Sequence, residues 1–144
     1  QAANGAVIVN DDAIVTAVHG GDYLLYDKKL KPLYKQVENT MVTAGLSLGR
    51  KVIVDRGVNV NSRSRRRFIG LAHALDALAV AVVFHPDSPE IHAQRRFNHD
   101  SRGFTLQQWI EVAQHHASRW QYPAQSEGWD DVRYMKFTAE DFNK

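Results

Sequence analysis

Three groups of residues in this chain could carry out chemistry on phosphate groups. Asp11 and Asp12 follow a short apolar run, and Asp55 ends a second one. Carboxylates at such positions can accept a proton or hold magnesium. A dense run of cations comes next in the chain, made up of Arg63, Arg65, Arg66 and Arg67. Because guanidinium groups bind phosphate well, acids and arginines together indicate phosphate chemistry.

The arginine run lies at the start of a predicted helix, where positive charge opposes the helix dipole. Stability alone therefore does not favour four cations there, and the pattern favours binding of a phosphate on a substrate or on a nucleic acid backbone. Helical spacing puts Arg63, Arg66 and Arg67 on one face and Arg65 elsewhere. A solvated helix surface is the alternative interpretation.

Composition sets the class of molecule. A chain of 144 residues is one domain with room for a core, and 44% apolar residues with 24% charge is ordinary for a globular protein. No apolar run approaches the roughly 20 residues of a membrane span. Without cysteine there is no disulfide framework or thiolate metal site, and a reducing cytoplasmic compartment is the simplest expectation. Basic and acidic residues occupy different segments, which suits an anionic partner.

The predicted strands and helices alternate along the chain. Strands are expected at residues 6–9, 51–55, 79–85 and 132–137, and helices at 13–18 and 27–48 and from residues 63, 89 and 105. The run 79–85 is continuously apolar, which predicts a strand covered on both faces. The long helix has a predicted apolar stripe of Leu30, Leu33, Tyr34, Val37, Met41, Ala44 and Leu48.

This order predicts an α/β fold, an open parallel sheet with helices on both faces. Ligands of such sheets bind at the carboxyl ends of the strands. Asp11, Asp12 and Asp55 all occupy those ends, so the fold should bring them to one edge of the sheet.

Four segments, in order, give the chain a family resemblance. It resembles the C-terminal part of the P-loop kinases related to phage polynucleotide 5'-kinase and to zeta-toxin-like kinases. The segments are VIVNDD (7–12), VIVDRGVNVNSRSRRRF (52–68), VVFHPDSPEIHAQRR (82–96) and YPAQSEGWDDV (122–132). The sequence departs from the family pattern where Arg56-Gly57-Val58 precedes Asn59, and where Ile14 replaces a frequent arginine.

The resemblance implies ATP and Mg²⁺ as cofactors and assigns roles to residues. Asp11 would be the general base on the attacking hydroxyl, with Asp12 as the alternative; a helix cap is the other interpretation for one of the two. Asp55 would help to hold Mg²⁺ or its water shell, or else is a turn residue before Gly57. The acceptor would be bound by Asn59, Arg63, Arg66 and Arg67.

A lid completes these implied roles. Its arginines, Arg95, Arg96 and Arg102, would stabilise charge on the transferred phosphoryl group, and Arg95 and Arg102 would contact ATP. The alternative is that one or two of them only cover the helix surface.

The chain contains no GxxxxGK[ST] phosphate loop. We therefore expect roughly 25–35 further residues before Gln1, with the first strand and that loop, because a strand, loop and helix take about that length. Residues 1–5 would be the end of that helix, and the strand would lie between residues 51–55 and 79–85.

Two classes of function stay open. The first is an ATP-dependent phosphotransferase acting on a hydroxyl, either a nucleic acid 5'-hydroxyl or, as in zeta-toxin-type kinases, a small molecule or nucleotide sugar. The second is a non-catalytic nucleic-acid-binding or interaction module, which the missing phosphate loop favours.

Overall fold

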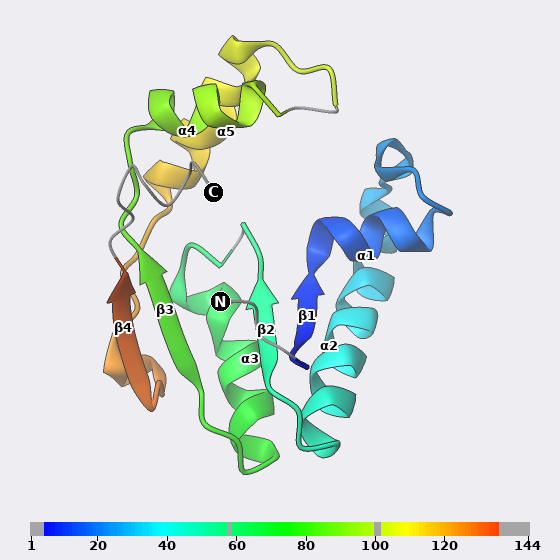
Figure 1. The fold of residues 1–144 in the computed structure, drawn as a ribbon, viewed down its shortest axis with the longest axis vertical. Coiled ribbons are helices and arrows are strands. Elements are labelled where there is room, and N and C mark those ends of the chain that lie inside the picture. The colour runs from blue at the N-terminus through cyan, green and yellow to red at the C-terminus, as the bar shows by residue number, and fades with distance from the viewer. Residues whose placement is uncertain (1–4, 58, 100–101, 136–144) are drawn as a thin grey trace. The chain divides into compact units, whose positions relative to one another are not determined.

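The computed structural model describes residues 5–57, 59–99 and 102–135, and it has the predicted α/β class with parallel strands (Figure 1). The strands are β1 (Val7–Asn10), β2 (Val52–Asp55), β3 (Val80–Phe84) and β4 (Asp131–Met135). The α-helices are α1 (Asp11–Val18), α2 (Lys31–Ser47), α3 (Ser62–Ala74), α4 (Pro89–Phe97) and α5 (Leu106–Ser118). Short 3₁₀ turns are η1 (Tyr23–Leu25), η2 (Lys28–Leu30) and η3 (Gln125–Glu127).

The chain divides into two compact units. The first unit is Gln1–Asn59 with Arg67–Leu78, and the second unit is Val60–Arg66 with Ala79–Lys144. The boundary between the units therefore falls inside α3. Each unit contains one two-stranded parallel sheet, β1–β2 in the first and β3–β4 in the second.

In the first unit, β1 and β2 pair in parallel so that Asn10 lies opposite Asp55 at their carboxyl ends. Apolar side chains from β1, the helices α1 and α2 and the middle of α3 form the core, which contains Val9, Ile14, Val15, Tyr34, Val42 and Phe68. Each of these segments thus directs its apolar side toward the same core, as expected for amphipathic elements that pack together.

The buried side of α2 differs from the predicted stripe. Its buried residues are Tyr34, Glu38, Val42 and Gly45, whereas the predicted stripe members Leu33, Ala44 and Leu48 are exposed. Two local causes explain the difference. Gly45 lets the helix approach the strands, because a Cβ there would lie 2.8 Å from Val52 Cγ2. Glu38 is buried through ion pairs, which a pattern of apolar residues cannot reveal.

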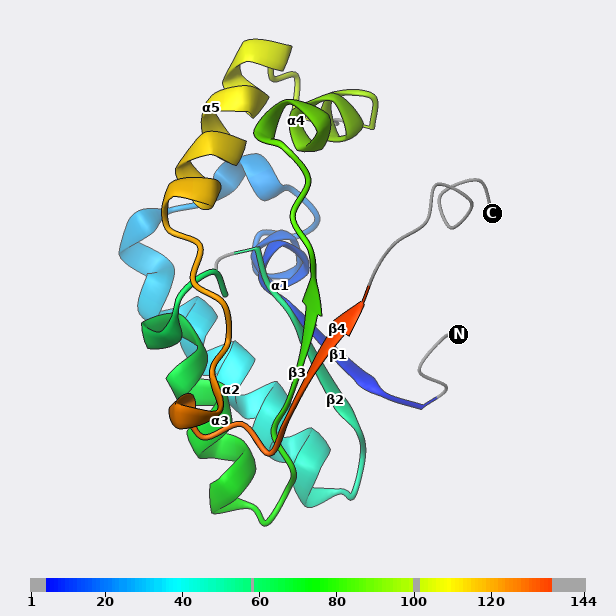
Figure 2. The same cartoon turned by 90° about the vertical axis from the view of Figure 1, so that its left-hand side faces the viewer.

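In the second unit, β3 pairs in parallel with β4, and α4 packs beside α5 (Figure 2). The predicted helix starts are confirmed: Ser88 caps α4, and Thr105 forms a capping box with Gln108 at the start of α5. The prediction that β3 is covered on both faces is wrong, because Ala81 and Val83 are buried while alternate residues are exposed. A run of apolar residues shows that a strand is hydrophobic, but it does not show which of its faces other elements cover.

No ladder pairs β2 with β3 in the described ranges, so the expected strand between them stays a prediction. Residues 1–5 are expected to end a helix, and residues 1–4 of that segment lie outside the described residues. Residues 136–137 of the last predicted strand lie outside them as well. Among the described helices, none combines the length and the hydropathy needed to cross a membrane.

Candidate functional site

The two adjacent aspartates lie at the junction of β1 and α1. Asn10 ends the strand and caps the helix, its Oδ1 accepting a hydrogen bond from the Ala13 N–H at 2.9 Å. The cap expected from one of the aspartates is thus provided by Asn10 instead. Asp11 and Asp12 occupy the first turn of α1, where the positive end of the helix dipole favours negative charge.

Asn10 also connects the two strand ends. Its Nδ2 donates to the backbone oxygen and to Oδ2 of Asp55, each at 3.2 Å. Asp55 itself is exposed. Parallel pairing therefore brings Asp55 and the aspartates that follow Asn10 to one edge of the sheet, as the sequence predicts.

Four charged side chains of the first unit form what we term the carboxylate–arginine cluster: Asp11, Glu38, Arg56 and Arg67. The Arg56 Nε lies 3.5 Å from Asp11 Oδ2 and 3.1 Å from Glu38 Oε1. The Arg67 Nη2 contacts the other Glu38 oxygen. Glu38 is only 2% exposed and lies at the centre. Both guanidinium groups also lie over the Phe68 ring, 5.6 Å and 4.4 Å from its centroid for Arg56 and Arg67.

The cluster alters the protonation of Asp11. Burial raises the pKa of the Asp11 carboxyl above its ordinary value of 3.8, and the charge of Arg56 opposes this shift. The negative charges of Asp12 and Glu38 add to the increase. A carboxylate with a raised pKa accepts a proton more readily, which is the property needed in a general base.

Arg67 presents a further feature within this cluster. Its Nη1 is buried, and no acceptor for it exists among the side chains and backbone that the structure describes. A buried cationic donor without an acceptor is costly, and an anion such as a phosphate oxygen would satisfy it.

Asp55 is the candidate for holding magnesium. In the described part of the chain, no group of three or more His, Cys, Asp or Glu side chains could hold a metal ion. Magnesium is usually bound by one or two carboxylates together with water and substrate phosphates. The single exposed carboxylate of Asp55 is a donor that fits this mode of binding.

The predicted acceptor-binding residues lie in different environments. Arg63 and Arg66 are exposed, Asn59 is half-buried, and Arg67 belongs to the carboxylate–arginine cluster. Arg65, which sequence spacing separates from the others, is 4% exposed. Its Nε and Nη2 donate to the two Glu127 oxygens at 2.9 Å and 2.6 Å, and this bond lowers the pKa of the Glu127 carboxyl.

The predicted lid arginines all lie in the second unit, on α4 and in the segment that leads to α5. Arg95 pairs with the exposed Asp87, with Nη1 2.6 Å from Oδ2. The guanidinium carbons of Arg96 and Arg102 lie 5.1 Å and 5.9 Å from the ring centroid of Trp109. The structure thus brings two of the three lid arginines to one buried indole.

Sequence reasoning did not identify Glu38 or single out Arg56 as a functional residue. A signal for Glu38 was present, since it lies four residues from both Tyr34 and Val42 on the buried line of α2. A charged residue within such a line predicts a buried ion pair. Arg56 was visible only as an insertion after Asp55, and its partners are far away in the sequence.

The comparison with protein families agrees with this fold. The family model described as "AAA domain" matches residues 1–120, which is most of the chain, and the chain belongs to this family. The family is P-loop NTPase-like and includes kinases, so the match supports a nucleotide-binding domain of the P-loop kinase-like class. No curated protein matches the chain.

Proposed function

We propose that this protein is an ATP-dependent phosphotransferase that moves the γ-phosphoryl group to a hydroxyl, with a nucleic acid 5'-hydroxyl as the acceptor. The observation that carries the proposal is Asp11, a carboxylate directly after β1 whose pKa is raised within the carboxylate–arginine cluster. The family match supports the nucleotide-binding part of the proposal. The resemblance to polynucleotide kinases supports the acceptor.

In this proposal, Asp11 accepts the proton of the attacking hydroxyl as the hydroxyl oxygen bonds to the γ-phosphorus. The bond between that phosphorus and the bridging oxygen breaks, and ADP leaves with the electron pair. The Arg56 guanidinium, 3.5 Å away, fixes the carboxylate. General-base catalysis of this kind contributes about 10²- to 10⁴-fold to a rate. Asp12, the next residue in α1, is the alternative base.

The other assigned residues would stabilise the negative charge of the phosphate groups. Asp55 would hold magnesium or its water shell, and the ion would neutralise charge on the phosphate oxygens when bound. Arg95, Arg96 and Arg102 would provide cationic groups for ATP and for the transferred phosphoryl group. The buried Nη1 of Arg67 is a further donor for a phosphate oxygen.

The test is transfer of labelled phosphate from ATP in the intact protein. The acceptors are a 5'-hydroxyl oligonucleotide and a panel of small hydroxyl compounds, including nucleotide sugars. We expect Asp11→Asn to retain less than about a hundredth of wild-type turnover, because the general base is lost. Nucleotide binding should be nearly unchanged.

Asp12→Asn is the matched control, because it makes the same change one residue further along α1. It should retain most of the activity. If Asp11→Asn keeps more than about a tenth of the turnover, Asp11 is not the base. Transfer to a small hydroxyl compound but not to the oligonucleotide would refute the assigned acceptor and leave the reaction class standing.

A further inference from the structure

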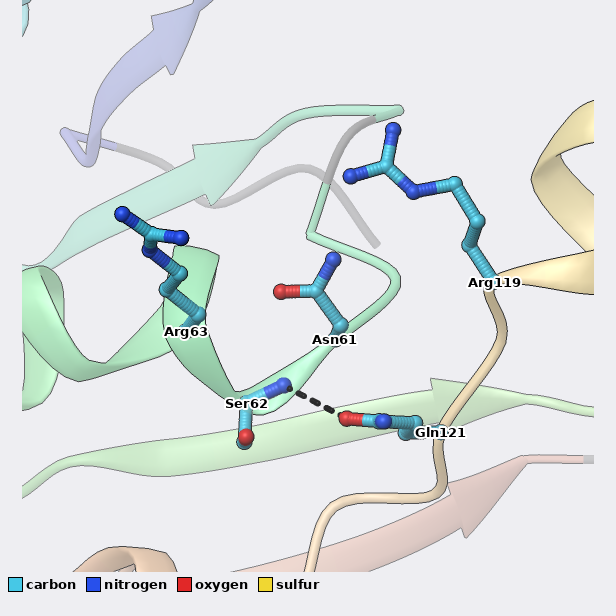
Figure 3. Close-up of a pocket in the computed structure, with 5 residues that line it drawn as sticks. All are labelled: Asn61, Ser62, Arg63, Arg119 and Gln121. Carbon is cyan, nitrogen blue, oxygen red and sulfur yellow. Dashed lines mark hydrogen bonds between the residues drawn. The ribbon is translucent and has the colours of Figure 1, made fainter.

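The second unit contains an open pocket with a volume of about 300 Å³ (Figure 3). The residues that line it are Asn61, Ser62, Arg63, Arg119 and Gln121. Two of these side chains carry a guanidinium group and none carries a carboxylate. Both arginines are exposed, so their charge is accessible from solvent. The pocket therefore has the character of an anion site.

The start of α3 and the segment after α5 build this pocket together. The Ser62 N–H donates to Gln121 Oε1 at 3.2 Å, and the Ser64 N–H donates to Asn61 Oδ1 at 3.0 Å. These two backbone donors already have acceptors. The groups that remain to bind an anion are therefore the guanidinium groups of Arg63 and Arg119, with Asn61 drawn between them in Figure 3.

A buried ion pair holds the two walls of the pocket together. Besides its two bonds to Glu127, Arg65 donates from Nη1 to the Gln121 backbone oxygen at 2.9 Å. The Gln121 N–H donates to the Val60 oxygen at 2.7 Å. Arg65 thus fixes the start of α3 against the segment that carries Gln121. Such preorganisation reduces the entropy that ligand binding must offset.

Aromatic side chains lie next to the pocket residues in the chain. Trp120 and Tyr122 alternate with the pocket residues Arg119 and Gln121. Tyr122 is 51% exposed, and its ring centroid lies 5.7–6.4 Å from those of Trp120, His85 and Tyr134. Proteins that bind single-stranded nucleic acid combine cations along the backbone with rings on which bases stack.

We propose that the second unit binds a single-stranded nucleic acid. Arg63 and Arg119 bind one backbone phosphate in the pocket, and the exposed Tyr122 ring stacks on a base. This inference rests on the proposed function, because the strand bound here is the acceptor of the phosphoryl group. The pocket would hold that strand at a position away from its reacting end. A small phosphorylated compound would use the same two arginines but would have no use for the exposed rings.

The test measures binding of the intact protein to a 3'-fluorescein oligothymidylate by anisotropy, without ATP and over a range of salt concentrations. We expect Arg63→Gln with Arg119→Gln to weaken binding about tenfold, since a charge-assisted hydrogen bond is lost. The slope of log affinity against log salt should fall by about 0.7, the value for one phosphate contact with a single strand. Tyr122→Leu should weaken binding at least about fivefold, through lost stacking.

Arg133→Gln is the matched control, because it removes one exposed guanidinium from the same unit. Arg133 pairs with Asp131 at 2.6 Å and does not line the pocket, so binding should be unchanged. Melting curves of all variants should overlap with wild type, because the side chains changed are exposed.

Wild-type affinity in the double variant would overturn the proposal. Full displacement of the strand by equimolar mononucleotide, with no effect of Tyr122→Leu, would show a site for small phosphates and would also overturn it. Because binding is measured without ATP, the two proposals can fail separately. If the pocket variants weaken strand binding but the protein transfers no phosphoryl group, this inference is supported and the proposed function is refuted. If the protein transfers the phosphoryl group but the pocket variants bind the strand as wild type does, the proposed function is supported and this inference is refuted.

Discussion

Replacement of Glu38 by glutamine should destabilise the first unit strongly. Glu38 is 2% exposed and is the carboxylate that contacts both Arg56 and Arg67. Glutamine keeps the volume of the side chain and one acceptor oxygen but removes the charge. Within the cluster, Arg56 would then keep only the carboxylate of Asp11 as a partner, and Arg67 would lose the carboxylate it contacts.

The magnitude follows from the burial of the pairs. Removing one partner of a buried ion pair costs about 3–5 kcal/mol, because the other charge stays buried without compensation. Arg56 and Arg67 retain 12% and 23% side-chain exposure, so some solvent screening remains and the lower value, about 3 kcal/mol, is expected. For a chain of this size that corresponds to a decrease in Tm of about 6–12 °C.

The assay is urea unfolding followed by circular dichroism at the helix signal. Tryptophan fluorescence is unsuitable, because the tryptophans are residues 109, 120 and 129, all in the second unit. Glu111→Gln is the control, since it makes the same chemical change on an exposed position of α5 and should alter stability by less than about 0.5 kcal/mol. Equal stabilities of the two variants would refute the assigned role of Glu38.

Two further predictions concern the same unit. Gly45→Ala should lower the free energy of unfolding by about 1–2 kcal/mol, because its Cβ would meet Val52 Cγ2 at 2.8 Å. Gly70→Ala has no atom within 4 Å of its new Cβ and should raise the free energy of unfolding by about 0.5–1 kcal/mol. Urea titrations that rank the two variants in the opposite order would contradict this packing. Because burial raises the pKa of Asp11 above 3.8, the charged form is disfavoured in the fold, and this group lowers stability as pH rises from 3.8 through its folded pKa. The Tm of Asp11→Asn relative to wild type should therefore increase between about pH 4 and pH 7, and a constant difference would count against a raised pKa.

Much of the fold could be predicted because its signals are local. Ser88 with Pro89, and Thr105, mark helix starts through capping chemistry within one turn of chain. The meeting of Asp11 and Asp55 at one edge follows from the alternation of strands and helices, which makes the sheet parallel. Neither conclusion requires knowledge of long-range side-chain contacts.

The carboxylate–arginine cluster could not be predicted in the same way. Its members come from α1, α2, the residue after β2 and the middle of α3, and they meet only once the helices have packed on the strands. Which side of α2 is buried depends on the close approach at Gly45 and on the partners of Glu38. The spacing of apolar residues shows neither that close approach nor those partners. The predicted apolar stripe therefore lies partly on a different side of α2 from the residues that are buried.

The arginine run shows how the structure changes an electrostatic argument from sequence. Four cations at the start of a helix oppose its dipole, which favours phosphate binding by the run, with Arg65 on a different face from the other three. Arg65 pairs with Glu127 and Arg67 contacts Glu38, so both have a carboxylate partner within the fold. The unfavourable charge is thus concentrated on the exposed Arg63 and Arg66. A phosphate ligand is the partner that would offset it there, and Arg63 already lines a pocket with a second arginine.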